Sequence, residues 1–205
     1  MAMGRPRSFD MDKALDEAME VFWRHGYEGA SINDLTKAMG INPPSLYAAF
    51  GNKEGLLRAA LDQYTLKHGQ HMDWVLAGAT AHEVAERFLM STADCHTQPG
   101  KPPGCLLVQG GLVCGSGSEN VPFEFAERRS RVETQLRDRF AHAHAEGDLP
   151  PDSDPAALAR FLACTTSGMG IMASAGADRD ALREVARVAA IAFARPTGRE
   201  EVAAA

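Results

Sequence analysis

The stretch from Ser31 to Lys53, SINDLTKAMGINPPSLYAAFGNK, constrains the fold more than any other part of the chain. Ser31 followed by Asp34 is typical of a helix start, because the hydroxyl can accept from a free backbone N–H and the acid suits the positive helix end. Apolar residues then recur at helical spacing, namely Ile32, Leu35, Ala38 and Met39. Gly40 can adopt the left-handed conformation that ends such a helix. The pattern predicts a short amphipathic helix that stops at Gly40.

A second short helix is predicted directly after it. Asn42 can cap this helix, and Pro43 and Pro44 fit its first two positions, where the backbone N–H groups have no partner inside the helix. Leu46 and Phe50 are four residues apart and can face inward. The residues that then face outward are Ser45, Tyr47, Ala48 and Ala49. Small side chains and one hydroxylated aromatic suit a close approach to base edges and phosphates of DNA.

A third helix follows, with Asn52 as its cap and Lys53 in its first turn. The helix dipole disfavours a cation at this position, so Lys53 indicates that a phosphate lies nearby.

The run from Phe9 to Leu57 resembles the DNA-binding domain of TetR-family transcriptional regulators. The matching positions are Ala18, Phe22, Gly26, Tyr27, Ser31, Ile32, Leu35, Ala38, Gly40, Ile41, Leu46, Tyr47, Phe50, Lys53 and Glu54. The resemblance implies an all-α protein of about nine helices. Residues 1–52 would form a three-helix, helix-turn-helix DNA-binding domain, and residues 53–205 a helical domain for effector binding and dimerisation.

The resemblance also assigns roles in DNA binding. Contacts to phosphates are expected from Ser31, Ser45, Tyr47 and Lys53, and contacts to bases from Pro43, Pro44 and Ala48. This sequence has Pro44 and Ala49 where the family often has glycine and histidine, so we assign no phosphate contact to residue 49. Arg5 and Arg7 lie in an N-terminal arm that can enter a minor groove, or that is simply a solvated tail.

Composition fits a soluble globular protein but does not identify a function. The chain has 205 residues, 45% hydrophobic and 23% charged, with a net charge of −6. Residues 1–67 hold 8 basic and 9 acidic side chains, a net −1, and the remainder hold 13 and 18, a net −5. The acidity therefore lies mostly outside the predicted DNA-binding domain. No signal peptide is evident, and the uncharged run 161–177 is short for a bilayer span, so we expect a cytoplasmic protein without a membrane segment.

Downstream of residue 53, helical patterns are predicted over residues 53–77, 81–96, 122–146, 155–177 and 178–195. The apolar segment 105–115 is consistent with either a strand or a helix by its pattern, and the resemblance implies a short buried helix. The predicted helix 155–177 is apolar or small on nearly every side, and the last predicted helix has apolar residues along one side. They need another surface to cover them, which predicts a homodimer that pairs these helices across a two-fold axis. A dimer would present its two reading helices to a palindromic operator in double-stranded DNA.

By the same resemblance, a small-molecule effector would bind among the helices after residue 53. The candidate lining residues are Met72, Trp74, Phe88, Met90, Leu107, Phe125, Phe161, Met169 and Met172. At helical spacing such residues are also what a plain hydrophobic core contains.

Two other functions remain open at this stage. One is a regulator of the same fold that senses oxidants or electrophiles through Cys95, Cys105, Cys114 or Cys164. The other is a thiol or metal hydrolase, with His68 and His71 as a possible pair of metal ligands. No nucleophile has a recognisable base beside it in the sequence, so we expect no enzymatic activity and no cofactor.

Overall fold

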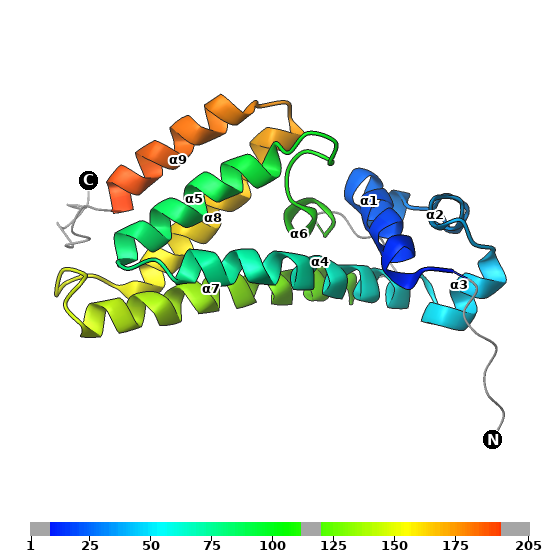
Figure 1. The fold of residues 1–205 in the computed structure, drawn as a ribbon, viewed down its shortest axis with the longest axis horizontal. Coiled ribbons are helices and arrows are strands. Elements are labelled where there is room, and N and C mark those ends of the chain that lie inside the picture. Colours follow the sequence, from blue (N-terminus) through cyan, green and yellow to red (C-terminus); the bar gives the residue numbers. More distant parts are fainter. Residues whose placement is uncertain (1–8, 112–119, 194–205) are drawn as a thin grey trace, which may run out of the picture.

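The computed structural model describes residues 9–111 and 120–193. Every element in these ranges is a helix, as predicted. Four helices build the N-terminal end of the elongated molecule and the connection that leaves it (Figure 1). They are α1 (Met11–Gly29), α2 (Ile32–Met39), α3 (Pro43–Phe50) and α4 (Lys53–Leu76). We call residues 10–52, which comprise α1, α2 and α3 with their caps, the head.

The caps read from the sequence explain where the helices of the head begin. Asp10 accepts from the backbone N–H groups of Asp12 and Lys13 and so starts α1. Gly40 has φ 66° and ψ 31°, and this left-handed conformation ends α2. Asn42 accepts from Ser45 N at 2.9 Å, with the two prolines in the first turn of α3. The predictions made for Gly40 and Asn42 are confirmed.

Helix α1 is kinked near its end, at Gly26. Gly26 has φ 67° and ψ 179°, a conformation that breaks the helical path, yet helical structure resumes and continues to Gly29. The kink turns Tyr27 inward, where it is 9% exposed and stacks near Phe22 with 6.2 Å between ring centroids. The glycine therefore bends the helix instead of terminating it.

The remaining five described helices form the body: α5 (Ala81–His96), α6 (Leu106–Gln109), α7 (Val121–Ala145), α8 (Pro155–Ser174) and α9 (Arg179–Phe193). Helix α7 runs beside α4, while α5 packs against both α8 and α9 (Figure 1). The segment whose pattern was compatible with strand or helix contains the four-residue helix α6, which lies between α1 and the body.

The interior of the head continues without a break into the body. Leu56, Leu57 and Leu61 of α4 belong to the same buried cluster as the core residues of α1 and α2. Phe125 of α7 is fully buried in that cluster. A Cβ placed on Gly110 would lie 2.6 Å from Phe125 Cζ, so glycine there lets α6 pack directly on the ring. The predicted division at residue 52 thus crosses a packed interior.

Helices α8 and α9 expose apolar side chains along one side. On α8 these are Phe161, Ile171 and Met172, and on α9 they are Val188 and Ile191, with exposed fractions from 39% to 68%. Within the described ranges, α8 alone is long and apolar enough to pass a length-and-composition test for a membrane span. A core helix passes the same test, and α8 packs against α5, α7 and α9.

Candidate DNA interface and effector cavity

Helix α3 presents the surface that the sequence predicted for reading DNA. Leu46 is fully buried and anchors the helix to the head. On the opposite side Tyr47 is 48% exposed, Pro43, Pro44 and Ala48 are exposed, and Ser45 is half-buried. Because one residue is fixed in the core, the others are held at a defined orientation toward solvent. Arg5 and Arg7 lie outside the described residues.

Ser31 has a structural role at the start of α2. Its hydroxyl accepts from the Asp34 backbone N–H at 3.0 Å and donates to the Asp34 carboxylate at 2.5 Å. That hydrogen bond holds the pKa of Asp34 below its usual value. The hydroxyl therefore has two partners already in the DNA-free protein.

Lys53 lies at the first position of α4, where Asn52 caps the helix by accepting from Gly55 N at 2.7 Å. The Lys53 ammonium lies 4.4 Å from the centroid of the Tyr27 ring, a cation–π distance. Burial lowers the pKa of Lys53, and the nearby Glu28 carboxylate opposes that effect. The ring thus contacts the ammonium of the residue that begins α4, and the N-terminus of a helix suits a phosphate.

A cavity of about 470 Å³ lies where the head meets the body. This volume falls within the range of about 300–1,000 Å³ that is usual for small-molecule sites. Its wall is built by α1, α4, α5, the loop before α6, α6 itself, α7 and α8. The α1 residues on the wall are Asp16, Met19 and Trp23, so the head supplies part of the cavity.

Three of the nine residues predicted to line an effector pocket are on this wall: Met72, Phe88 and Leu107. The other six lie elsewhere for identifiable reasons. Phe125 fills the junction between head and body, Met90 and Met169 pack in the body core, Phe161 and Met172 are exposed on α8, and Trp74 is 49% exposed beside Arg87.

Sequence reasoning missed most of the polar wall. Those residues include Tyr64, His68, His71, Thr92 and His96. A signal was present, because Tyr64, His68 and His71 recur at helical spacing on α4, and Thr92 and His96 are four apart on α5. The predicted pocket lining contained apolar residues only, and His68 and His71 were named solely as a possible pair of metal ligands.

The pKa values of the histidines, cysteines and tyrosine on the wall are shifted in the direction that favours their uncharged forms. Burial lowers the pKa of His68 and His71, and it lowers the pKa of His96 to about 4. Burial also raises the pKa of the Cys95 and Cys105 thiols. The Tyr64 hydroxyl, 3.8 Å from Cys105 Sγ, has a pKa well above its ordinary value, again through burial. The described residues contain no cluster of three or more His, Cys, Asp or Glu side chains suited to a metal ion.

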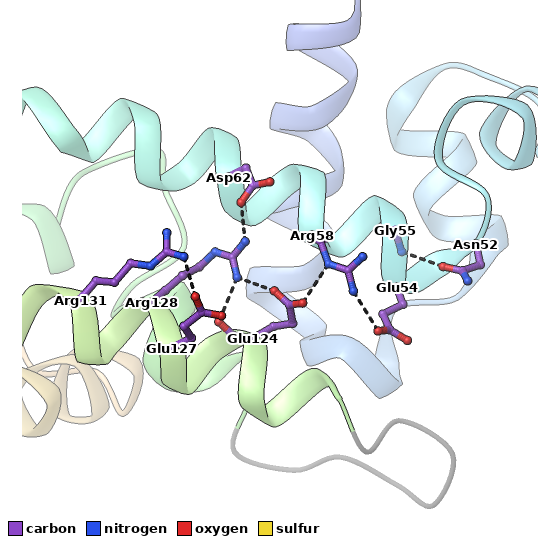
Figure 2. A network of polar contacts seen from close by, with 9 residues as sticks. All are labelled: Asn52, Glu54, Gly55, Arg58, Asp62, Glu124, Glu127, Arg128 and Arg131. Carbon is purple, nitrogen blue, oxygen red and sulfur yellow. Dashed lines mark hydrogen bonds and ion pairs between the residues drawn. The ribbon is translucent and has the colours of Figure 1, made fainter.

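A network of ion pairs joins α7 to the first half of α4 (Figure 2). Arg128, 6% exposed, donates to Glu124 at 2.6 Å and also to Asp62. Arg58 in turn donates to Glu124 at 2.9 Å and to Glu54 at 3.2 Å. Arg128 lines the cavity, so the network leads from the cavity wall to the turn of α4 that contains Lys53.

Comparison with known proteins agrees with this architecture. Residues 14–60 match the model of "Bacterial regulatory proteins, tetR family", and residues 83–189 match "Tetracyclin repressor-like, C-terminal domain". The transcriptional repressor ComR of Escherichia coli K12 is 37% identical over 89% of this chain and 88% of its own length. The repressor BdcR of the same organism is 29% identical over 70% of this chain and 72% of its own.

Solved structures include a cysteine mutant of the TetR-family regulator CifR in complex with 26-base-pair double-strand operator DNA. It is 43% identical to this chain, has a TM-score of 0.88, and the match covers 92% of this chain and 99% of CifR. With two family models spanning head and body and relatives matched over nearly their full length, the chain belongs to the TetR family of transcriptional regulators.

Proposed function

We propose that this protein is a dimeric repressor that binds a palindromic operator through α3 and is released from it by a small molecule in the cavity. The observation that carries the proposal is the geometry of α3, whose Leu46 is locked in the core while Pro43, Tyr47 and Ala48 face solvent. Apolar contact with thymine methyl groups is the base recognition that such side chains favour. The repressors ComR and BdcR support repression as the outcome of binding.

Release by a ligand needs a cavity whose shape depends on the position of the head. Residues of α1 form part of the wall, and Arg128 links the wall to α4. A ligand shifts a population of conformations only if it binds one of them better. In this proposal the ligand favours a placement of the two heads that does not match the operator.

Operator binding is tested with DNA from upstream of the protein's own gene, by fluorescence anisotropy of a labelled fragment. Tyr47→Ala and Lys53→Ala each remove a proposed phosphate contact, and we expect each to weaken binding about tenfold or more and to reduce its salt dependence. Arg137→Ala is the matched control, because Arg137 is exposed on α7 and pairs with its neighbour Asp138. If both head variants bind like the wild type, α3 and the start of α4 do not read this DNA.

Dimerisation is proposed to occur through the exposed apolar side chains of α8 and α9. Ile191, 60% exposed on α9, is an informative position because an aspartate there would be buried without a partner in the dimer. We expect Ile191→Asp to sediment as a monomer and to lose operator binding. Leu66→Asp, on an exposed α4 position, controls for the added charge. A dimeric Ile191→Asp variant would place the interface elsewhere.

Thiol sensing is a second candidate, since Cys95 and Cys105 lie on the wall of the same cavity. Burial raises the pKa of both thiols and reduces the thiolate fraction, which favours reversible ligand binding over it. Cys164 is exposed on α8, and Cys114 lies outside the described residues. Release of the operator by a quinone from the wild type but not from Cys105→Ser would favour the thiol mechanism.

We also propose a cytoplasmic location, which the membership of a DNA-binding family supports. The proposed division into residues 1–52 and 53–205 describes function, since the packed interior is shared between the two parts.

A further inference from the structure

Flat rings form much of the cavity wall. Trp23 meets Tyr64 edge-on at 5.6 Å between ring centroids, and Tyr64 lies 4.2 Å from the ring of His68. Phe88, His71 and His96 add three further rings around the same space. Ring walls make their best contacts with a planar molecule that can stack or meet them edge-on.

The ionised side chains around the cavity leave little charge for a ligand to neutralise. Four of the cations already have carboxylate partners: Lys67 with Asp16, Lys101 with Glu20, Arg128 with Asp62 and Glu124, and Arg131 with Glu127. Arg129 donates to the carbonyl of Leu107, and Asp73 is exposed to solvent. Arg129 is thus the one cation of this described set without a carboxylate partner. An ion that entered would lose its hydration, and the carboxylate-paired side chains would offer it little in return.

Two wall residues, Arg128 and His96, have a buried polar atom without a hydrogen-bond partner among the described residues. The other guanidinium nitrogens of Arg128 already donate to Glu124 and Asp62, whereas the His96 ring makes no hydrogen bond. His96 is 9% exposed, and its Nδ1 atom is buried with no hydrogen-bond partner among the described residues. Gly170 leaves room for this ring, since a Cβ there would lie 3.3 Å from His96 Cε1. A neutral imidazole offers one N–H donor and one acceptor nitrogen, and a buried group left unsatisfied costs free energy. Of the two ring nitrogens of His96, only Nδ1 is fully buried, so the unpartnered Nε2 is the polar atom that a ligand on this wall can reach.

His71 differs from His96 because its polar edge is already engaged. The Ser91 hydroxyl donates to the carbonyl of Arg87, so in this geometry His71 Nε2 donates to Ser91 Oγ at 2.9 Å. This bond fixes the tautomer of His71 and occupies the edge that faces α5.

We propose that the cavity binds an uncharged, planar aromatic molecule with one hydroxyl or carbonyl group, and that His96 determines specificity by hydrogen-bonding that group. The assignment rests on the proposed function, because it names the class of ligand that would release the operator. The rings select for planarity, the paired ions select against charge, and His96 selects for the polar substituent.

The test is calorimetric titration of the full-length protein with four probes of one size. 2-Naphthol has all three proposed properties. Naphthalene lacks the hydroxyl, 2-naphthoate adds a negative charge, and decahydro-2-naphthol is not planar. We expect 2-naphthol to bind at least about tenfold more tightly than each of the others, the size of effect that one good interaction produces.

Variants of His96 test its part separately. In His96→Leu, the preference for 2-naphthol over naphthalene should fall to about twofold or less, since no polar atom remains. His96→Gln keeps a donor and an acceptor and should retain a preference. His82→Leu is the matched control on the same helix, because His82 is exposed and lies off the wall. Retained preference in His96→Leu would overturn the role of His96.

Tightest binding of 2-naphthoate, or equal binding of all four probes, would overturn the ligand class. Operator affinity is measured in the same preparations, so the two proposals fail differently. Intact operator binding with no preference among probes rejects only the ligand assignment. Tight, His96-dependent binding of 2-naphthol that leaves operator affinity unchanged rejects ligand-controlled release and keeps the site.

Discussion

The indole Nε1 of Trp23 donates to Oε1 of Gln109 at 3.0 Å, a hydrogen bond between residues 86 positions apart. It joins α1 of the head to α6 of the body, and both residues are half-buried. Trp23 also lines the cavity, so the same side chain forms part of the cavity wall and links the head to α6.

We expect Trp23→Phe to lower the free energy of unfolding by about 1 kcal/mol, because Gln109 Oε1 loses its donor while most of the ring contact remains. Urea unfolding followed by circular dichroism measures this change. Trp74→Phe is the control and should cost about 0.5 kcal/mol or less, since Trp74 is 49% exposed. Equal losses in the two variants would deny the Trp23–Gln109 bond a stabilising role.

The ion-pair network predicts an order of effects. Arg128→Met leaves Glu124 and Asp62 without their buried partner, and we expect a loss of about 1–3 kcal/mol. Asp62→Asn should cost less than about 1 kcal/mol, because the Asp62 side chain is 66% exposed. Urea unfolding at low ionic strength compares them. A larger loss in Asp62→Asn than in Arg128→Met would mean that the exposed Asp62 carboxylate contributes more to stability than the buried Arg128 does.

The pKa of His96 predicts how stability varies with pH. Burial lowers this pKa from 6.5 to about 4, so between these values the unfolded chain binds the proton and the folded protein does not. The contribution of His96 to the free energy of unfolding is therefore fully present above about pH 6.5. It is lost as the pH falls toward 4, which lowers the free energy of unfolding by up to about 3 kcal/mol. His68 and His71 act in the same direction.

Urea unfolding at pH 7, 5.5 and 4.5 measures the effect, and His96→Gln should have a shallower dependence over this range. Carboxylates such as Glu124, whose pKa is lowered chiefly by Arg128, add their own loss near the acid end in both proteins. An identical pH dependence in wild type and variant would show that His96 does not remain neutral on folding.

Glycine at the junction gives a packing prediction. Gly110→Ala would place a Cβ 2.6 Å from Phe125 Cζ, and we expect a loss of about 1–3 kcal/mol from the forced shift of α6. Gly69→Ala on α4 meets nothing within 4 Å and should be neutral or stabilising by up to about 1 kcal/mol. Thermal unfolding distinguishes the two. A neutral Gly110→Ala would indicate that α6 can move away from Phe125 freely.

Features set by neighbouring residues were predictable from the sequence. The caps at Ser31, Asn42 and Asn52 and the buried Leu46 depend on contacts within a few residues, and each was predicted correctly. The body helices other than α6 followed from their apolar spacing, whereas the pattern of residues 105–115 left strand and helix open.

The cavity was harder to predict because its wall depends on how distant helices align. Trp23 and His96 are 73 positions apart, and nothing local indicates that they share one space. Phe125 is an aromatic residue of the kind that often lines a pocket, but Gly110 and Gly111 allow α6 to pack over its ring. Helix packing therefore determines which side chains face the cavity. The periodicity of one helix gives no information about how it packs against distant helices.

The presence of Asp16, Met19 and Trp23 on the cavity wall has a consequence for competition inside the cell. Coupling between two binding sites is reciprocal, so a molecule that weakens operator binding by some factor is itself held less tightly, by that factor, when the protein is on DNA. In the proposed mechanism, operator DNA and the releasing ligand would therefore weaken each other's binding. A stronger operator would require a higher concentration of that molecule before transcription begins.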